Sequence, residues 1–334
     1  MGPWRVTFVT NPDDCNLRCI MCRSGSGWAR PPDRRQRPRR RMDLALLRRI
    51  LEERRGSGLA EIIPSTEGEP LLYPEMDGLL DLCAAAGVKV NLTTNGTFPG
   101  RGASAWAERL APACSDVKVS WNGAVARTAE AIMPGLRFED ALAGLRDFAA
   151  VRDRMTSRGW DRCRLSLQVT AMEPNVAELP EIVRLAASLG VDRVKVNQLQ
   201  VHFEELRPLS LRRSAASIAR WNAVARACRA AAAEVRRRSG RKIALENVVE
   251  LQPDPRHPAP LGPCPFLAQE AWVTVDGRFA PCPAPQRKRL GELGSLRERT
   301  MGEIWESEGY RNLCRDYRSH PVCRECSFRR PGGA

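Results

Sequence analysis

The chain has 334 residues, 43% of them hydrophobic, which is enough for one large core or a large core with a small appendage. It contains no run of about 18 apolar residues and no signal-peptide pattern at its start, so we predict a cytoplasmic protein. The formal net charge is +14, and part of it lies in "RPPDRRQRPRRR" (30–41). That run holds no aromatic residue for base stacking, so we interpret it as a solvated loop; closure of Arg34 to Arg41 over an anion stays open.

Apolar runs alternate with amphipathic helical patterns through most of the chain, which is typical of repeated βα units and a parallel sheet. We expect helices over 42–58, 75–86 and 210–238, the first ending at Gly56 and Gly58. Strands are expected over seven segments: 4–10, 61–66, 88–97, 116–123, 164–172, 192–201 and 242–248.

The composition changes after the last of these strands. Residues 252–265 contain six prolines, which can continue neither a helix nor a central strand. We therefore predict three parts: a main domain over 1–251, a linker over 252–263 and a small domain over 264–334. The small domain is expected to begin with a hairpin that turns at Asp276–Gly277, followed by a helix over 300–316.

Three of the twelve cysteines lie close together after the first expected strand. Cys15, Cys19 and Cys22 have a C-x3-C-x2-C spacing, and the next cysteine is Cys83. Clustered thiols in a reducing compartment indicate metal ligands rather than disulfides. Zinc sites with an open position usually use His or carboxylate ligands, so an iron–sulfur cluster with one free iron is the sharper interpretation.

This triad resembles the signature of radical S-adenosylmethionine (SAM) enzymes, in which the free iron binds the amino and carboxylate groups of SAM. The segment "EGEPLLYP" (67–74) is similar to the Gly-Glu-Pro motif of that family, and "LTTNGT" (92–97) and "VSWNG" (119–123) resemble its next strand ends. One departure is Met21, at a position that is often aromatic in the family. The resemblance implies a partial (β/α)6 barrel, and it implies SAM contacts at Met21, Gly68, Glu69, Ser120, Asn122, Gln168 and Asn197, with Thr170 beside them.

A second set of cysteines lies in the small domain. Gly277 and Cys282 form a G-x4-C pattern, and Cys323 and Cys326 form C-x2-C. With Cys264 they resemble the shortened SPASM extension called a twitch domain, an α+β unit that holds one auxiliary cluster. The resemblance implies two [4Fe–4S] clusters, the second bound by Cys264, Cys282, Cys323 and Cys326. A structural zinc ion bound by these four thiolates is the alternative.

The resemblance also implies reductive cleavage of SAM and hydrogen abstraction from a carbon. We expect a small-molecule substrate, a sugar or oligosaccharide of antibiotic biosynthesis, because the triad begins at residue 15 and leaves no room for a leader-recognition domain. Epimerisation is the first prediction, with Cys314 as hydrogen donor and Cys163 as second candidate. A twitch-type dehydrogenase that forms a ketone and a peptide-modifying enzyme are alternatives.

We further expect an external electron donor such as flavodoxin or ferredoxin, and neither a membrane nor a nucleic acid as partner. A basic nucleic-acid-binding protein with two metal knuckles is the alternative outside enzymes. It would not need six or seven strands, and it would bind with a steep dependence on salt.

Overall fold

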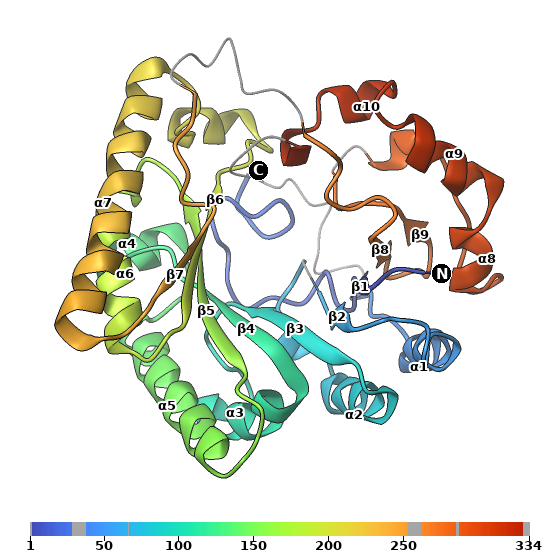
Figure 1. Ribbon diagram of the computed structural model, residues 1–334, viewed down its shortest axis with the longest axis horizontal. Coiled ribbons are helices and arrows are strands. Elements are labelled where there is room, and N and C mark those ends of the chain that lie inside the picture. Colours follow the sequence, from blue (N-terminus) through green and yellow to red (C-terminus); the bar gives the residue numbers. More distant parts are fainter. Residues whose placement is uncertain (1, 29–37, 66, 253–261, 285–286, 330–334) are drawn as a thin grey trace.

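The computed structural model describes residues 2–28, 38–65, 67–252, 262–284 and 287–329 (Figure 1). Most of the predicted linker and Arg34 to Arg37 lie outside these residues. The described strands form one sheet in the order β7-β6-β5-β4-β3-β2-β1-β8-β9. Their bounds are β1 (Arg5–Phe8), β2 (Glu61–Ile63), β3 (Lys89–Thr94), β4 (Cys114–Ser120), β5 (Arg164–Ala171), β6 (Arg193–Gln198), β7 (Ala244–Glu246), β8 (Glu270–Val273) and β9 (Phe279–Ala280).

Strands β1 to β7 are adjacent in chain order and parallel, as the alternating pattern predicts. The sheet curves without closing, and most of the helices in the first 239 residues lie around its outer side (Figure 1). They are α1 (Leu44–Glu53), α2 (Met76–Ala86), α3 (Gly102–Ala113), α4 (Ala126–Ile132), α5 (Phe138–Ser157), α6 (Leu179–Ser188) and α7 (Ala215–Ser239). The predicted partial barrel is confirmed.

The two faces of the sheet differ because side chains alternate along each strand. Val117, Leu167 and Val194 belong to the continuous hydrophobic core with the helices. The alternate residues are polar and bond across strands: Arg193 donates to Ser166 over 3.1 Å and to Glu246 over 2.6 Å. The concave face of the barrel is therefore a polar surface.

The C-terminal segment joins the main sheet. Strand β8 lies parallel to β1 and forms the predicted hairpin with β9, with Gly277 in the turn at φ +87°. The helix expected over 300–316 is instead two helices, α8 (Met301–Trp305) and α9 (Glu308–Asp316), since Ser307 caps the second one. Helix α10 (Pro321–Arg324) follows. The domain boundaries at 251 and 264 stay predictions.

Contacts between the tail and helix α1 fix this arrangement. The Glu53 carboxylate accepts hydrogen bonds from the backbone N–H groups of Met301 (3.0 Å) and Gly302 (2.9 Å), at the start of α8. A carboxylate is favourable at a helix N-terminus, where backbone N–H groups lack partners. Among the helices of the described residues, none combines the length and the apolar character that crossing a bilayer requires.

Candidate functional site

The cysteine triad lies on an irregular loop that follows β1 at the carboxyl edge of the sheet. Cys15 is exposed, and Cys19 and Cys22 are half-buried. Burial, together with the neighbouring thiols of Cys22 and Cys15, raises the pKa of Cys19 to about 12. Backbone N–H groups donate to two of the three sulfurs, Leu17 to Cys15 over 3.4 Å and Gly25 to Cys22 over 3.2 Å. Such donors suit thiolates that bind a cluster.

Two aspartates before the triad anchor its loop to the end of the basic run. The buried Asp14 forms ion pairs with Arg39 (3.0 Å) and Arg41 (2.8 Å), and Asp13 pairs with Arg40 (2.8 Å). The described part of the basic run thus holds the cluster loop in place. Sequence reasoning missed this role, although the acidic "PDDC" and the basic "PRRR" were a signal of opposite charge.

The Gly68–Glu69 segment packs directly against the same loop. Gly68 has φ +78°, and a Cβ there would lie 2.2 Å from the Asn11 carbonyl oxygen and 2.7 Å from that of Asp14. Only glycine allows this approach. The backbone N–H of Glu69 donates to the Asp14 oxygen over 2.6 Å, so the predicted SAM-binding motif and the cluster loop form one unit.

The Glu69 side chain is buried and fully hydrogen-bonded. Its carboxylate accepts from the backbone N–H groups of Leu71 (3.1 Å) and Asn95 (2.7 Å) and from the Thr94 hydroxyl (2.7 Å). Burial raises the pKa of Glu69 to about 7 despite these donors. The acid therefore lies where a cation would be favoured, which fits the ammonium group of SAM. Thr94 and Asn95 are functional neighbours that sequence reasoning missed.

The remaining predicted SAM contacts differ in their surroundings. Ser120 ends β4, and its register partner Gln168 lies within β5; the Asn197 amide oxygen accepts from Asn247 over 3.1 Å. Asn122 instead is buried: its amide oxygen accepts from the Thr170 N–H (2.8 Å), and its amide nitrogen contacts the Met133 sulfur. We therefore assign Asn122 a structural role. Met21 is half-buried against the core beside the triad.

The four C-terminal cysteines come together from three segments. Cys282 and Cys323 are buried, and Cys264 and Cys326 are half-buried. Burial, with smaller contributions from the thiols of Cys264, Cys326 and Cys323, raises the pKa of Cys282 to about 12, so the four cysteines are neighbours in the fold. Across the described residues, no group of three or more Cys, His, Asp or Glu side chains is spaced to hold a single metal ion.

A buried arginine joins these segments, and no sequence pattern pointed to it. The Arg329 guanidinium donates to the carbonyls of Gly262 (2.8 Å) and Cys323 (2.7 Å) and lies 5.2 Å from the centre of the Tyr317 ring. The Tyr317 hydroxyl in turn accepts from the Cys264 N–H over 3.1 Å. Arg329 and Tyr317 thus hold Cys264 and Cys323 in one arrangement.

The two predicted hydrogen donors lie in different places. Cys314 is half-buried on α9, hydrogen-bonded to Tyr310 and close to Cys264. Cys163 is buried just before β5, at the amino end of the sheet, with its thiol directed to the Arg164 carbonyl. It lies at the opposite end of the strand from the cluster loop, so the geometry gives Cys163 no path to a substrate. The role of Cys314 stays a prediction.

Comparison with known families agrees with both cysteine sites. Residues 12–160 match the radical SAM superfamily, and residues 264–327 match the iron–sulfur cluster-binding domain called SPASM. The chain therefore contains a radical SAM domain and a C-terminal SPASM domain. These domains indicate SAM and two iron–sulfur clusters as cofactors, one of them auxiliary. When bound, the first cluster and SAM supply a 5′-deoxyadenosyl radical.

Individual relatives are similar to this chain over different shares of their lengths. The chain is 30% identical to the mycofactocin maturase MftC of Mycobacterium tuberculosis over 188 residues, 56% of this chain and 41% of that protein, so it spans less than half of that relative. It is 26% identical to the PqqA peptide cyclase of a Methylobacterium species, over 94% of this chain and 76% of that protein. SuiB of Streptococcus suis has the same fold, with a TM-score of 0.67 at 16% identity over 94% of this chain and 68% of SuiB.

These relatives correct the predicted substrate. One is named a peptide cyclase, and SuiB has been crystallised with a precursor peptide. The expectation of a sugar-type small molecule is wrong, and neither an epimerase nor a dehydrogenase of antibiotic sugars is supported. The motifs in this sequence belong to SAM cleavage, which enzymes with different substrates share, so they do not specify the substrate.

Proposed function

We propose that this chain modifies a peptide by hydrogen abstraction from one of its carbons. The observation that carries the proposal is the similarity to the PqqA peptide cyclase, which extends over 94% of this chain.

In this proposal the residues described above have separate tasks. Cys15, Cys19 and Cys22 hold the SAM cluster and leave one iron open, and Glu69 favours the SAM ammonium group beside it. Ser120, Gln168 and Asn197 line the carboxyl edge, where they can orient SAM. The second site is closed by four ligands: Cys264, Cys282, Cys323 and Cys326. The auxiliary cluster therefore has no free iron to bind the peptide.

The test is anaerobic reconstitution of the wild type and of a Cys15/Cys19/Cys22→Ala variant, with iron counted in both. We expect about eight irons to fall to about four, as for two [4Fe–4S] clusters. Under dithionite, only the wild type should form 5′-deoxyadenosine.

The substrate is tested separately, by mass spectrometry of peptides encoded beside the gene after incubation with SAM. A change in peptide mass with the wild type alone supports the proposal. SAM cleavage without any peptide change, together with turnover of a sugar, would overturn it.

A further inference from the structure

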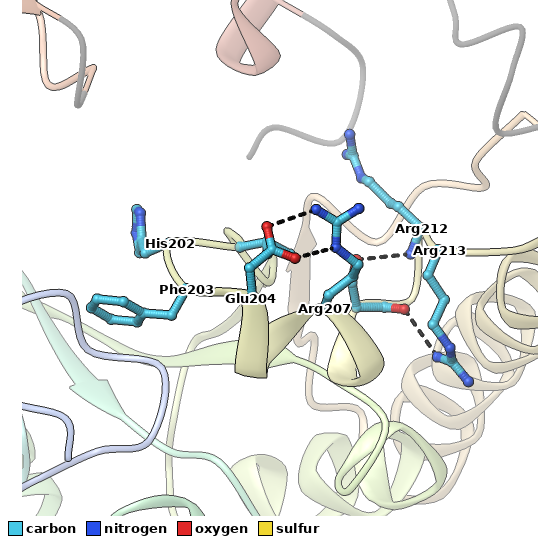
Figure 2. Close-up of a pocket in the computed structure, with 8 residues that line it drawn as sticks. His202, Phe203, Glu204, Arg207, Arg212 and Arg213 are labelled. Carbon is cyan, nitrogen blue, oxygen red and sulfur yellow. Dashed lines mark hydrogen bonds and ion pairs between the residues drawn. The ribbon is translucent and has the colours of Figure 1, made fainter. Parts of the chain in front are cut away.

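A pocket of about 430 Å³ lies beside the cluster loop, in the segment that follows β6. Its walls come from the 3-10 helix η3 (Glu204–Leu209), the residues before it and the turn before α7. Figure 2 shows the lining side chains: Val201, His202, Phe203, Glu204, Arg207, Ser210, Arg212 and Arg213. We call it the β6 pocket. Its volume lies within the range of ordinary ligand sites, about 300–1,000 Å³.

The pocket opens near the chemistry. Strand β6 ends at the carboxyl edge of the sheet, the edge that also carries the triad loop. The charge of Arg23, the residue after Cys22, reaches His202: burial lowers the His202 pKa, and Arg23 lowers it further. His202 is therefore neutral at pH 7 and adds an aromatic, hydrogen-bonding wall rather than a charge.

The lining is cationic. Arg207, Arg212 and Arg213 line it, and Glu204 is the one carboxylate among the lining residues; the Arg213 guanidinium pairs with Glu173, so Arg207 and Arg212 supply the positive charge of the pocket. The positive end of the 25-residue helix α7 adds to this field, because the helix begins directly after Arg213 and Ser214. The pocket thus selects an anion with a flat, two-oxygen group that a guanidinium can bind with two hydrogen bonds.

Glu204 already shows how such a group binds. Its carboxylate accepts two hydrogen bonds from Arg207, at 2.9 and 2.8 Å (Figure 2). Both side chains are largely exposed, Arg207 to 68% and Glu204 to 80%, and an exposed ion pair is easily exchanged because its net contribution to stability is small. A carboxylate that arrives on a ligand can therefore replace Glu204 on Arg207.

We propose that the β6 pocket binds an acidic side chain of the peptide substrate and so positions the peptide across the barrel mouth. This proposal rests on the proposed function and adds a substrate class: a peptide that carries Asp or Glu at a position other than the residue that reacts. Val201 and Phe203 supply apolar walls for the methylene groups of such a side chain.

The test uses two fluorescein-labelled decapeptides, (Glu-Gly)5 and (Gln-Gly)5, and measures anisotropy with the reconstituted enzyme at low salt. We expect (Glu-Gly)5 to bind at least tenfold more tightly. Arg207→Gln with Arg212→Gln should remove that preference, and Arg207→Lys should restore only part of it, because lysine lacks the two-pronged geometry.

Arg184→Gln is the matched control, an exposed arginine on α6 that pairs with Glu181 and Glu234. If it weakens binding as much as the pocket variants, the net charge of the chain explains binding and the proposal fails. Equal binding of the two peptides also overturns it, and competition by millimolar inorganic phosphate but not by glutamate would identify a phosphate site instead.

Failure of this proposal is distinguishable from failure of the proposed function. If the pocket variants modify a precursor peptide with unchanged KM, the pocket has no role while peptide modification stands. If (Glu-Gly)5 binds as expected but no peptide is modified, the proposed function is wrong.

Discussion

The two cysteine sites are built in opposite ways. The triad lies within eight consecutive residues on one loop, with Cys15 exposed and none of the three fully buried, and ion pairs of Asp14 hold that loop. The auxiliary cysteines come from segments up to 62 residues apart in sequence, and two of the four are buried. The open site needs little tertiary structure to assemble, whereas the closed site is itself part of the tertiary structure of the tail.

The two cysteine sites should differ most in their response to the loss of one cysteine ligand. Cys282→Ser should release the tail, because metal binding supplies folding free energy to a segment with few apolar residues of its own. Cys19→Ser should abolish SAM cleavage and leave the tail folded. Limited trypsin digestion of the two reconstituted variants checks this, with cleavage after residue 287 at least roughly tenfold faster in Cys282→Ser. Equal cleavage rates would mean that the tail folds without its cluster.

The backbone conformation of Gly68 gives a second prediction, for the stability of the triad loop. Gly68→Ala places a Cβ against two carbonyl oxygens at a residue with φ +78°, so we expect a loss of about 3–5 kcal/mol in unfolding free energy. Gly56→Ala is the matched control, since Gly56 has φ +72° with open space around it and should lose only about 1–2 kcal/mol. Urea unfolding of the apo proteins measures both. Similar losses would show that strain alone, and not contact with the cluster loop, explains Gly68.

Glu69 makes the same region sensitive to pH. Its pKa is about 7 in the folded chain against 4.5 ordinarily, so the folded state holds a proton that the unfolded state has lost. Stability should therefore fall as pH rises from about 4.5 to 7, by up to about 3 kcal/mol, and stay level above that. Glu69→Gln should lack this slope, although its amide opposes the Asn95 N–H and lowers stability at every pH. Urea unfolding of both apo proteins from pH 5 to 8 decides it, and parallel slopes would place the titrating group elsewhere.

The sequence predicted the triad site better than the auxiliary site for the same physical reason. Local spacing was enough for Cys15, Cys19, Cys22 and the Gly68–Glu69 segment, since these are short motifs with fixed geometry. Pairing of β8 with β1 joins residues 265 apart, and nothing near Glu270 signals its partner Arg5. The substrate could not be predicted either, because it depends on the barrel mouth and not on the motifs for SAM.

Arg329 is the clearest example of a residue that no local sequence pattern reveals, and its substitution has the smallest expected effect of the four predictions. Its partners among the described residues are two carbonyls and the Tyr317 ring, and it is only 9% exposed, so a cation is buried beside Cys323. A cluster held by four thiolates is anionic and becomes more so on reduction. A buried cation therefore favours the reduced form and raises the reduction potential.

We expect Arg329→Gln to lower the auxiliary potential by about 59 mV, a tenfold change in a one-electron equilibrium. The measurement is an EPR-monitored redox titration in the Cys15/Cys19/Cys22→Ala background, where only the auxiliary cluster remains. Arg318→Gln is the control, because Arg318 contacts the same Tyr317 ring at 5.9 Å but is exposed to solvent, which screens its charge. Arg329→Lys should keep the potential near the wild-type value while weakening the link to Gly262. If both glutamine variants shift the potential equally, or neither does, the fixed charge of Arg329 has no special effect, and the closed site differs from the triad in burial alone.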